Sequence, residues 1–149
     1  MKPNFSISVF GIIKDEKNQI LLCLRNDYDL WNLPGGGLEN SETPWQGVVR
    51  EVKEETGLDV KVNKLLCVYS KPEKNTVGFD FECEIIGGKL TLNEEAKEIK
   101  YFSLSEIPKN TIPKQVERIN NYVENTCNST RMLVQNGRPV LELIKEGKL

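Results

Sequence analysis

The 149-residue sequence predicts an α/β fold built as a single domain. Three observations support this prediction. Short runs rich in apolar and β-branched residues are separated by polar loops, and one segment carries the end signals of a helix at both of its ends. No internal repeat or low-complexity stretch breaks this order, and the glycines and prolines separate short elements rather than form linkers.

The chain begins with two β-rich runs, Ser6–Ile13 and Gln19–Arg25, separated by the polar stretch 14–18. This pattern is typical of a hairpin with a polar loop. A loop and a Gly-Gly-Gly turn at 35–37 follow. Further strands are predicted at Val60–Tyr69, Val77–Ile86 and Ile99–Leu104.

A helix is predicted over about Pro44–Thr56. Thr43 can act as its N-cap, and Pro44 occupies the first helical position, where a missing N–H costs nothing. Gly57 suits the left-handed residue that closes a helix. Both ends of this helix are therefore marked by local signals.

One side of this helix is apolar. Val48, Val52 and Trp45 recur at helical spacing, so we expect this stripe to pack against a sheet. An interior glycine costs about 0.5–1 kcal/mol relative to alanine, and Gly47 therefore indicates that another group approaches the helix closely.

The tail of the sequence predicts two further elements. Pro113–Glu124 has Val116, Ile119 and Val123 near helical spacing, which indicates a helix. Residues 132–143 resemble a hairpin with an Asn-Gly turn. Three roles remain open for this tail: capping the domain, shaping a pocket or forming a homodimer contact.

The composition excludes several classes of chemistry. The sequence contains no histidine, so a Ser-His-Asp or Cys-His system, a His-ligated zinc site and a histidine base are all excluded. Lys and Arg number 20 against 22 Asp and Glu, a formal charge of −2. This balance provides no bulk electrostatic surface for nucleic acid or for an anionic membrane.

No apolar run approaches the roughly 18 residues of a membrane helix, and residues 1–8 lack the apolar core of a signal peptide. We therefore expect a cytoplasmic protein that does not bind membranes. The four cysteines form no C-x-x-C pair, and we expect them to be reduced. Cys23, Cys67 and Cys83 fall in apolar strands, where they act as small hydrophobic residues.

The other side of the predicted helix is acidic. Glu51, Glu54 and Glu55 stand at i, i+3 and i+4, so their side chains share one face. Like charges repel, and a cluster of oxygen ligands without cysteine or histidine selects a hard cation such as Mg²⁺ or Mn²⁺. The alternative from the helix alone is a solvated acidic surface. Arg50 can bridge to Glu54 or orient a neighbouring carboxylate.

The surrounding spacing favours the metal site. Gly36 is followed after five residues by Glu42, and after seven more by Arg50-Glu51-Val52-Lys53-Glu54-Glu55-Thr56-Gly57-Leu58. This resembles the Nudix hydrolase signature, G-x5-E-x7-R-E-U-x-E-E-x-G-U, where U is a bulky aliphatic residue, and every fixed position matches. The resemblance implies an α/β/α sandwich with a mixed central sheet, with a core over about residues 5–108 and an extension over about 109–149.

The resemblance also implies roles for individual residues. Glu51, Glu54 and Glu55 would be metal ligands, together with the carbonyl of Gly36, and Arg50 would orient the carboxylates. We favour Glu51 as the base or as a ligand partner of the base. A further acidic ligand is expected from Glu94, Glu95 or Glu98, of which Glu95 fits best by its distance before Tyr101.

Substrate contacts are less clearly marked. Tyr28 and Trp31 lie on the loop before the signature and could stack against a base, and Arg25 could contact phosphates. Tyr69 and Phe79 are further aromatic candidates, and Lys71 is a further cation. Each of these residues has an alternative role in the core or on the surface.

The resemblance implies Mg²⁺-dependent hydrolysis of a pyrophosphate bond in a nucleotide or in a nucleoside diphosphate linked to another group. The substrate is expected to be a small molecule, and long nucleic acid is disfavoured by the neutral charge balance. Two alternatives belong to other classes: a nucleotide-sensing or interaction module without turnover, and a scaffold protein whose acidic helix binds nothing.

Overall fold

The computed structural model describes residues 2–149. Eight strands, three α-helices and two short 3-10 helices follow one another along these residues. They are β1 (Ser6–Ile13), β2 (Ile20–Arg25), β3 (Trp31–Asn32), β4 (Gly35–Gly37), α1 (Pro44–Thr56), β5 (Leu58–Lys71), η1 (Pro72–Lys74), β6 (Thr76–Gly88), β7 (Ala96–Phe102), η2 (Leu104–Glu106), α2 (Pro113–Glu124), β8 (Arg131–Val134) and α3 (Val140–Lys145).

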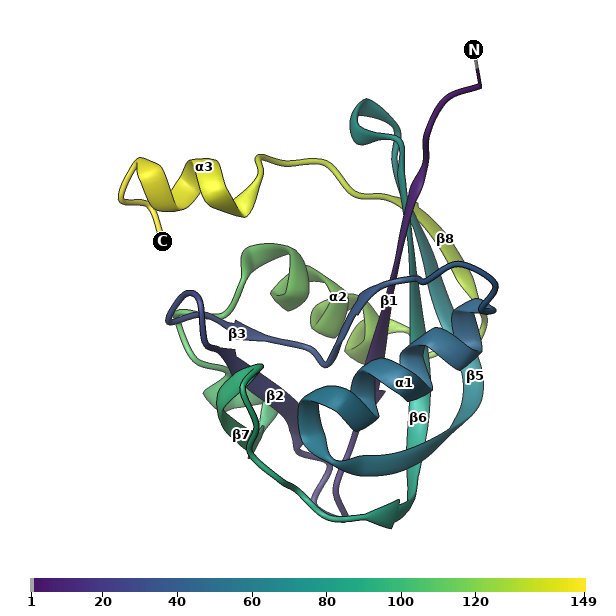
Figure 1. Ribbon diagram of the computed structural model, residues 1–149, viewed down its shortest axis with the longest axis vertical. Helices are drawn as coiled ribbons and strands as arrows, with labels where there is room; N and C mark the ends of the chain where they lie inside the picture. The colour runs from purple at the N-terminus through teal and green to yellow at the C-terminus, as the bar shows by residue number, and fades with distance from the viewer. Residues whose placement is uncertain (1) are drawn as a thin grey trace.

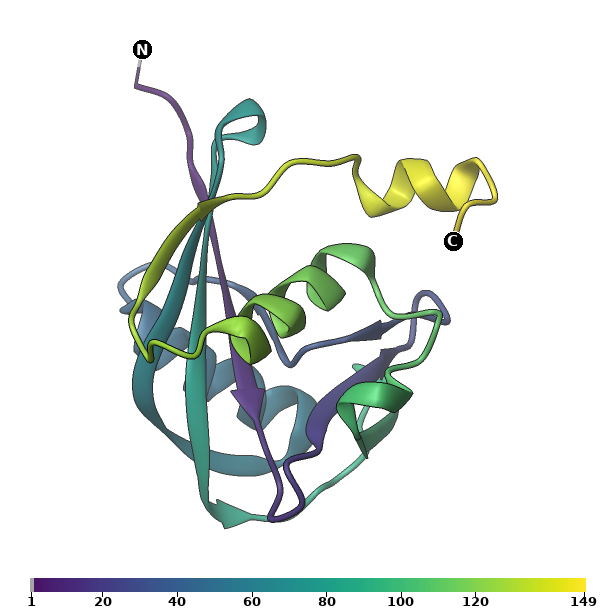
Figure 2. The ribbon, with the colours of Figure 1, turned by 180° about the vertical axis from the view of Figure 1, so that it is seen from behind.

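The strands form two sheets. The larger is mixed, in the order β4-β1-β6-β5-β8, and the smaller is antiparallel, in the order β3-β2-β7. In the larger sheet β1 runs parallel to β6 and β8 runs parallel to β5, whereas β4–β1 and β5–β6 are antiparallel. The helices α1 and α2 lie on opposite sides of the sheet region, as Figures 1 and 2 show from the front and from behind. The predicted α/β/α sandwich with a mixed sheet is therefore confirmed.

The core has two parts, one under each large helix. Val48 and Val52 of α1 are fully buried and belong to a cluster with residues of β1, β2, β5 and β6. Ile119 of α2 belongs to a second cluster, which includes Ile12, Leu33 and residues of the smaller sheet. Burial of such side chains contributes about 1.5–3 kcal/mol each, so the two clusters fix the helices on the sheets.

The predicted hairpin of the first two strands is wrong in its pairing. Both strands exist, but β1 belongs to the larger sheet and β2 to the smaller one. A single bridge between Lys14 and Ile20 joins them. Each strand instead has other neighbours on both sides: β1 pairs with β4 and β6, and β2 pairs with β3 and β7.

The prediction of a C-terminal hairpin over residues 132–143 is also wrong. Its first arm is β8, which adds to the edge of the larger sheet beside β5. The second arm is the helix α3, which begins after Pro139 and extends away from the body of the molecule in both views (Figures 1 and 2). The proline provides the fixed φ that suits a helix entry, and it removes a donor that a strand would need.

Two expectations about helix faces need correction. Trp45 is 56% exposed, so the apolar stripe of α1 that packs on the sheet consists of Val48 and Val52.

On α2 the helix itself is confirmed, but Val123 is exposed and the buried side includes the polar Gln115 and Arg118. Arg118 pairs with buried Asp80 and lies between the rings of Phe10 and Tyr69, which explains how a charge is held there.

The described cysteines are free, and Cys23, Cys67 and Cys83 are buried as expected. Among residues 2–149, no helix is long and apolar enough to cross a membrane.

Candidate active site

The helix α1 positions the acidic side chains, and its ends are as the sequence predicts. Thr43 accepts a hydrogen bond from the backbone N–H of Gln46, whose side chain in turn accepts one from the N–H of Thr43. Gly57 adopts a left-handed conformation with φ 79° and donates its N–H to Lys53. Because Val48 and Val52 face the sheet, the acidic side of the helix is turned toward the loop around β4.

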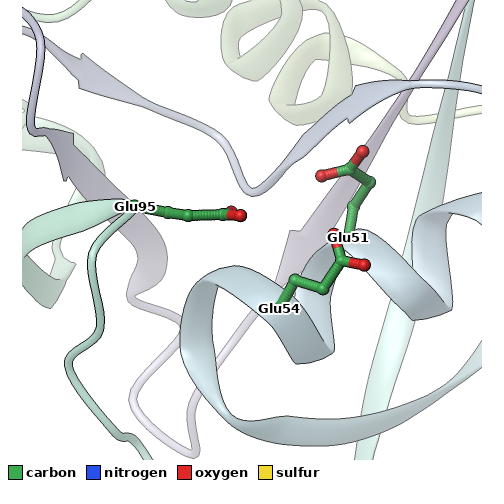
Figure 3. A group of neighbouring side chains, drawn as sticks. All are labelled: Glu51, Glu54 and Glu95. Carbon is green, nitrogen blue, oxygen red and sulfur yellow. The ribbon is translucent and has the colours of Figure 1, made fainter.

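Three carboxylates from two distant segments meet here. Glu51 and Glu54 come from α1, and Glu95 comes from the loop that precedes β7 (Figure 3). Figure 3 shows the Glu95 side chain pointing toward the helix from the opposite side of the gap. Each residue offers one carboxylate oxygen, and the three oxygens lie within 4.8 Å of one another.

Gly36 lies directly against this cluster. A Cβ atom built on Gly36 would lie 2.7 Å from Oε1 of Glu51, so a side chain here would push the Glu51 carboxylate away. The residue is held in place because β4 pairs with β1, with Gly36 opposite Val9. The glycine therefore lets backbone and carboxylate approach each other.

The loop that carries Glu95 is fastened by a residue that the sequence analysis missed. Asn93 accepts a hydrogen bond from the N–H of Glu95 at 2.8 Å through Oδ1, and its amide donates to the carbonyl of Glu54. Asn93 thus links the loop to the end of α1. The signal in the sequence is an asparagine two residues before a candidate ligand, the pattern of an Asx turn.

Arg50 connects most of the acidic residues on this face. Its guanidinium lies 2.6 Å from Glu42, 3.0 Å from Glu51 and 3.1 Å from Glu54, and it donates to the carbonyl of Gly37 at 3.0 Å. Hydrogen bonds from Arg50 and from the N–H of Glu39 lower the pKa of Glu42 to about 2. Glu42 is therefore the permanently charged anchor that orients Arg50.

The pKa values of Glu51 and Glu55, which lie deeper in the site, are shifted in the opposite direction to that of Glu42. Burial raises the pKa of Glu51 against the opposing effect of Arg50. Burial also raises the pKa of Glu55 to about 8, assisted by the charges of Glu51 and Glu95, although Glu55 accepts a hydrogen bond from the N–H of Gly35 at 3.3 Å. Crowded carboxylates thus take up protons when no cation balances them.

These residues fit a divalent cation with oxygen ligands. Opposite ligands of an octahedral Mg²⁺ lie about 4.2 Å apart, close to the spread of the three carboxylate oxygens. The donor set within reach consists of oxygen atoms, which suits Mg²⁺ or Mn²⁺. Burial, and to a lesser extent the neighbouring carboxylates, raises the pKa of Glu51 and of Glu55, and a bound cation would oppose both effects.

A cleft of about 450 Å³ opens beside the carboxylates. Its lining includes Gly36, Glu55 and Glu95, so Glu95 is the member of the cluster that lies in its wall. Asn32 lines the cleft as well, and its Oδ1 is buried without a hydrogen-bond partner in the part of the chain that the structure describes. Phe10, Asn26 and Asn32 are cleft residues that no motif in the sequence marks.

The three residues expected to contact substrate occupy different places. Arg25 lines the cleft, and Asp27 holds its guanidinium at 2.5 Å. Tyr28 is half-buried and lies beside Arg25, whose guanidinium carbon is 5.7 Å from the ring centroid. Trp31 is only 7% exposed and packs edge-on against Phe102 in the core, so we leave it out of the proposed site.

The acidic helix, the close-packed glycine strand and the cleft together form a site whose oxygen donors suit a divalent cation. A family model described as NUDIX domain matches residues 4–122. The chain belongs to this family.

Named relatives agree with this assignment. The chain is 41% identical over 111 residues to an ADP-ribose pyrophosphatase of Methanocaldococcus jannaschii, covering 70% of this chain and 65% of that protein. It is 38% identical over 105 residues to a MutT-like protein of Streptomyces ambofaciens, covering 70% and 68%. The chain thus spans about two thirds of the length of these relatives. The class that fold, helix and relatives define together is that of the Nudix-type pyrophosphohydrolases.

A solved structure gives the same result for the fold. The crystal structure of an ADP-ribose pyrophosphatase from Streptococcus suis superimposes with a TM-score of 0.72 at 27% sequence identity. The superposition covers 87% of this chain and 99% of that one.

Proposed function

We propose that this protein hydrolyses a pyrophosphate bond in a nucleoside diphosphate linked to another group, with Mg²⁺ or Mn²⁺ as cofactor. The observation that carries the proposal is the meeting of Glu51, Glu54 and Glu95 beside Gly36, at the edge of a cleft that Gly36 and Glu95 line. Glu51, Glu54 and Glu95 would hold the cation, with Glu55 and the carbonyl of Gly36 as further ligands. When bound, the cation supplies charge neutralisation on the phosphates and lowers the pKa of water.

The residues of the chain have distinct tasks in this proposal. Water attacks one phosphorus atom, the bond from that phosphorus to the bridging oxygen breaks, and two phosphate monoesters leave. Glu51 is our candidate for the base that accepts the proton of the attacking water, since it is half-buried and next to the glycine strand. Arg50 fixes the direction of Glu51 and Glu54, and Arg25, which lines the cleft, would contact the phosphates.

We propose ADP-ribose as the first substrate to test, because proteins with that named activity are among both the sequence relatives and the structural neighbours. The balanced products would be AMP and ribose 5-phosphate. A cytoplasmic location and a homodimer stay predictions.

The test is a panel assay of the full chain with Mg²⁺ and with Mn²⁺. ADP-ribose, nucleoside triphosphates, oxidised nucleotides, nucleotide sugars and dinucleoside polyphosphates are offered in turn, and the products are identified by mass. We expect turnover that requires the metal and that falls at least about tenfold in Glu54→Gln. Glu16→Gln is the matched control, because Glu16 is exposed in the loop between β1 and β2 and forms no ion pair in the described chain.

Thermal unfolding separates the alternatives from other classes. A rise in the unfolding temperature with metal and nucleotide, but without products, would support a sensing module and overturn hydrolysis. No rise with any divalent ion would support a scaffold protein and would overturn the metal site itself. If the protein is the proposed enzyme, we expect a divalent ion to raise the unfolding temperature of wild type. We expect this rise to be lost in Glu51→Gln, because removal of one ligand leaves two of the three carboxylates.

A further inference from the structure

A second charged cluster lies away from the carboxylate site. Lys71 at the end of β5, Lys74 in η1 and Lys114 at the start of α2 line one shallow pocket with Gln135, Asn136 and Gly137. In the larger sheet, two strands separate β5 from β4, which carries Gly36. None of the three lysines lines the cleft beside Glu95. This lysine pocket is therefore a separate feature of the molecule.

The three ammonium groups lack acidic partners. Within residues 2–149, no carboxylate lies within 4 Å of Lys71, Lys74 or Lys114, whereas Lys61 on the same strand as Lys71 pairs with Glu84 at 3.3 Å. The acids nearby are Glu73, which is exposed on the pocket rim, Glu117, which accepts a hydrogen bond from Gln135, and Asp80, which acts on Lys71 but pairs with Arg118. None of these acids forms an ion pair with the three lysines.

Burial and neighbouring positive charges make the charged forms of these lysines unfavourable in the absence of a ligand. Burial and the charges of Arg118, Lys114 and Lys74 lower the pKa of Lys71 to about 8. Burial together with Lys74 and Arg118 also lowers the pKa of Lys114. Like charges held together repel, and an anion between them would remove this repulsion.

The pocket is held in shape by a buried amide. Gln135 is 2% exposed, donates through Nε2 to the carbonyl of Lys114 at 3.0 Å, and accepts from Arg118 at 3.3 Å. The stem of Lys114 lies against Gly137, since a Cβ atom there would be 3.6 Å from its Cε. Lys114 is thus positioned by the contact between α2 and the segment after β8, while Lys71 lies at the end of β5 and Lys74 in η1.

We propose that Lys71, Lys74 and Lys114 form a binding site for a phosphate group. Three ammonium groups offer point charges and rotatable donors, which suit a tetrahedral oxyanion. Two sources share this chemistry: a terminal phosphate of a nucleotide that reaches this pocket, and free inorganic phosphate. The site goes beyond the proposed hydrolysis and does not depend on it.

Calorimetric titration of the full chain with inorganic phosphate and inorganic tripolyphosphate tests the site. EDTA is present so that divalent ions do not bring phosphate to the carboxylates. We expect wild type to bind, and Lys71→Gln and Lys114→Gln to bind about tenfold more weakly. Lys61→Gln, the ion-paired lysine of the same strand, should bind as wild type does. Absence of binding to wild type, or equal binding by all four proteins, overturns the proposal.

Two further measurements sharpen the result. Without phosphate, Lys71→Gln should unfold at the same temperature as wild type or higher, because repulsion is removed; a lower temperature would contradict the unbalanced charge. Glu54→Gln should still bind phosphate in EDTA, so the lysine pocket and the proposed hydrolysis fail independently. If Lys114→Gln has a higher KM for nucleoside triphosphates, the lysine pocket binds a phosphate of the substrate. If its KM is unchanged while its binding of inorganic phosphate is weaker, the pocket binds free phosphate.

Discussion

Arg50 and Glu42 form a two-pronged ion pair in which Nη2 lies 2.6 Å and Nε lies 2.9 Å from the two carboxylate oxygens. The remaining nitrogen of the guanidinium is thereby aimed at Glu51 and Glu54. Glu42 belongs to the segment before α1, so the pair links that segment to the helix. The direction of both candidate ligands therefore depends on a residue that touches neither metal nor substrate.

This relationship predicts the effect of a conservative change. Lysine cannot reproduce the planar fork, so Arg50→Lys should lower kcat/KM by about 10–100-fold although the charge is kept. Initial rates with the best substrate of the panel measure this. Lys53→Gln, on the same helix but paired with exposed Asp59, should stay within about twofold. Equal activity of Arg50→Lys and wild type would show that the carboxylates do not need the fork.

Adjacent glycines provide a matched pair of variants. In Gly36→Ala the new methyl group would displace the Glu51 carboxylate, since it would lie 2.7 Å from Oε1. A Cβ on Gly37 meets nothing within 4 Å. We expect Gly36→Ala to lose the metal-induced rise in unfolding temperature and at least about tenfold in activity, while Gly37→Ala keeps both. Similar behaviour of the two variants would place the metal away from Gly36.

Glu55 predicts a dependence of stability on pH in EDTA. Its ordinary pKa of 4.5 rises to about 8 in the folded protein, so between these values the folded state holds a proton that the unfolded state has lost. Stability from this group is therefore full below pH 4.5 and declines as pH rises toward 8, with a slope of up to about 1.4 kcal/mol per pH unit.

Urea midpoints at several pH values measure this decline, and Glu55→Gln should remove most of it because the amide does not titrate. Divalent ions should also reduce the decline, since they favour the charged form. A Glu55→Gln variant with the same pH dependence as wild type would assign the decline to another group.

Arg25 lines the cleft and forms an exposed pair with Asp27. Arg25→Gln should raise KM about tenfold with kcat little changed, because its contact with phosphate is made in the ground state as well as in the transition state. Steady-state kinetics measure both constants. Asp27→Asn should change KM less, since the guanidinium stays in the cleft. A fall in kcat at constant KM would instead give Arg25 a role in the chemical step.

The sequence by itself determined the helix α1 and its acidic face. Thr43, Pro44 and Gly57 act through contacts with their immediate neighbours, and the spacing of Glu51 and Glu54 follows from the helical repeat. The signature also indicated the need for Gly36, although the distance to Glu51 required the structure. These features depend on residues close together in the chain, which is why they could be predicted.

The tertiary structure decided what depends on distant partners. β1 and β2 separate into two sheets because β1 pairs along its length with β6 and β2 pairs along its length with β7. The segment after β8 forms the helix α3, which begins after Pro139. Trp31 is buried because Phe102 lies against it. Three acidic residues before Tyr101 are candidate ligands in the sequence, and the structure brings Glu95 to Glu51 and Glu54. The packing of the loop decides this, because Asn93 joins the loop to the end of α1.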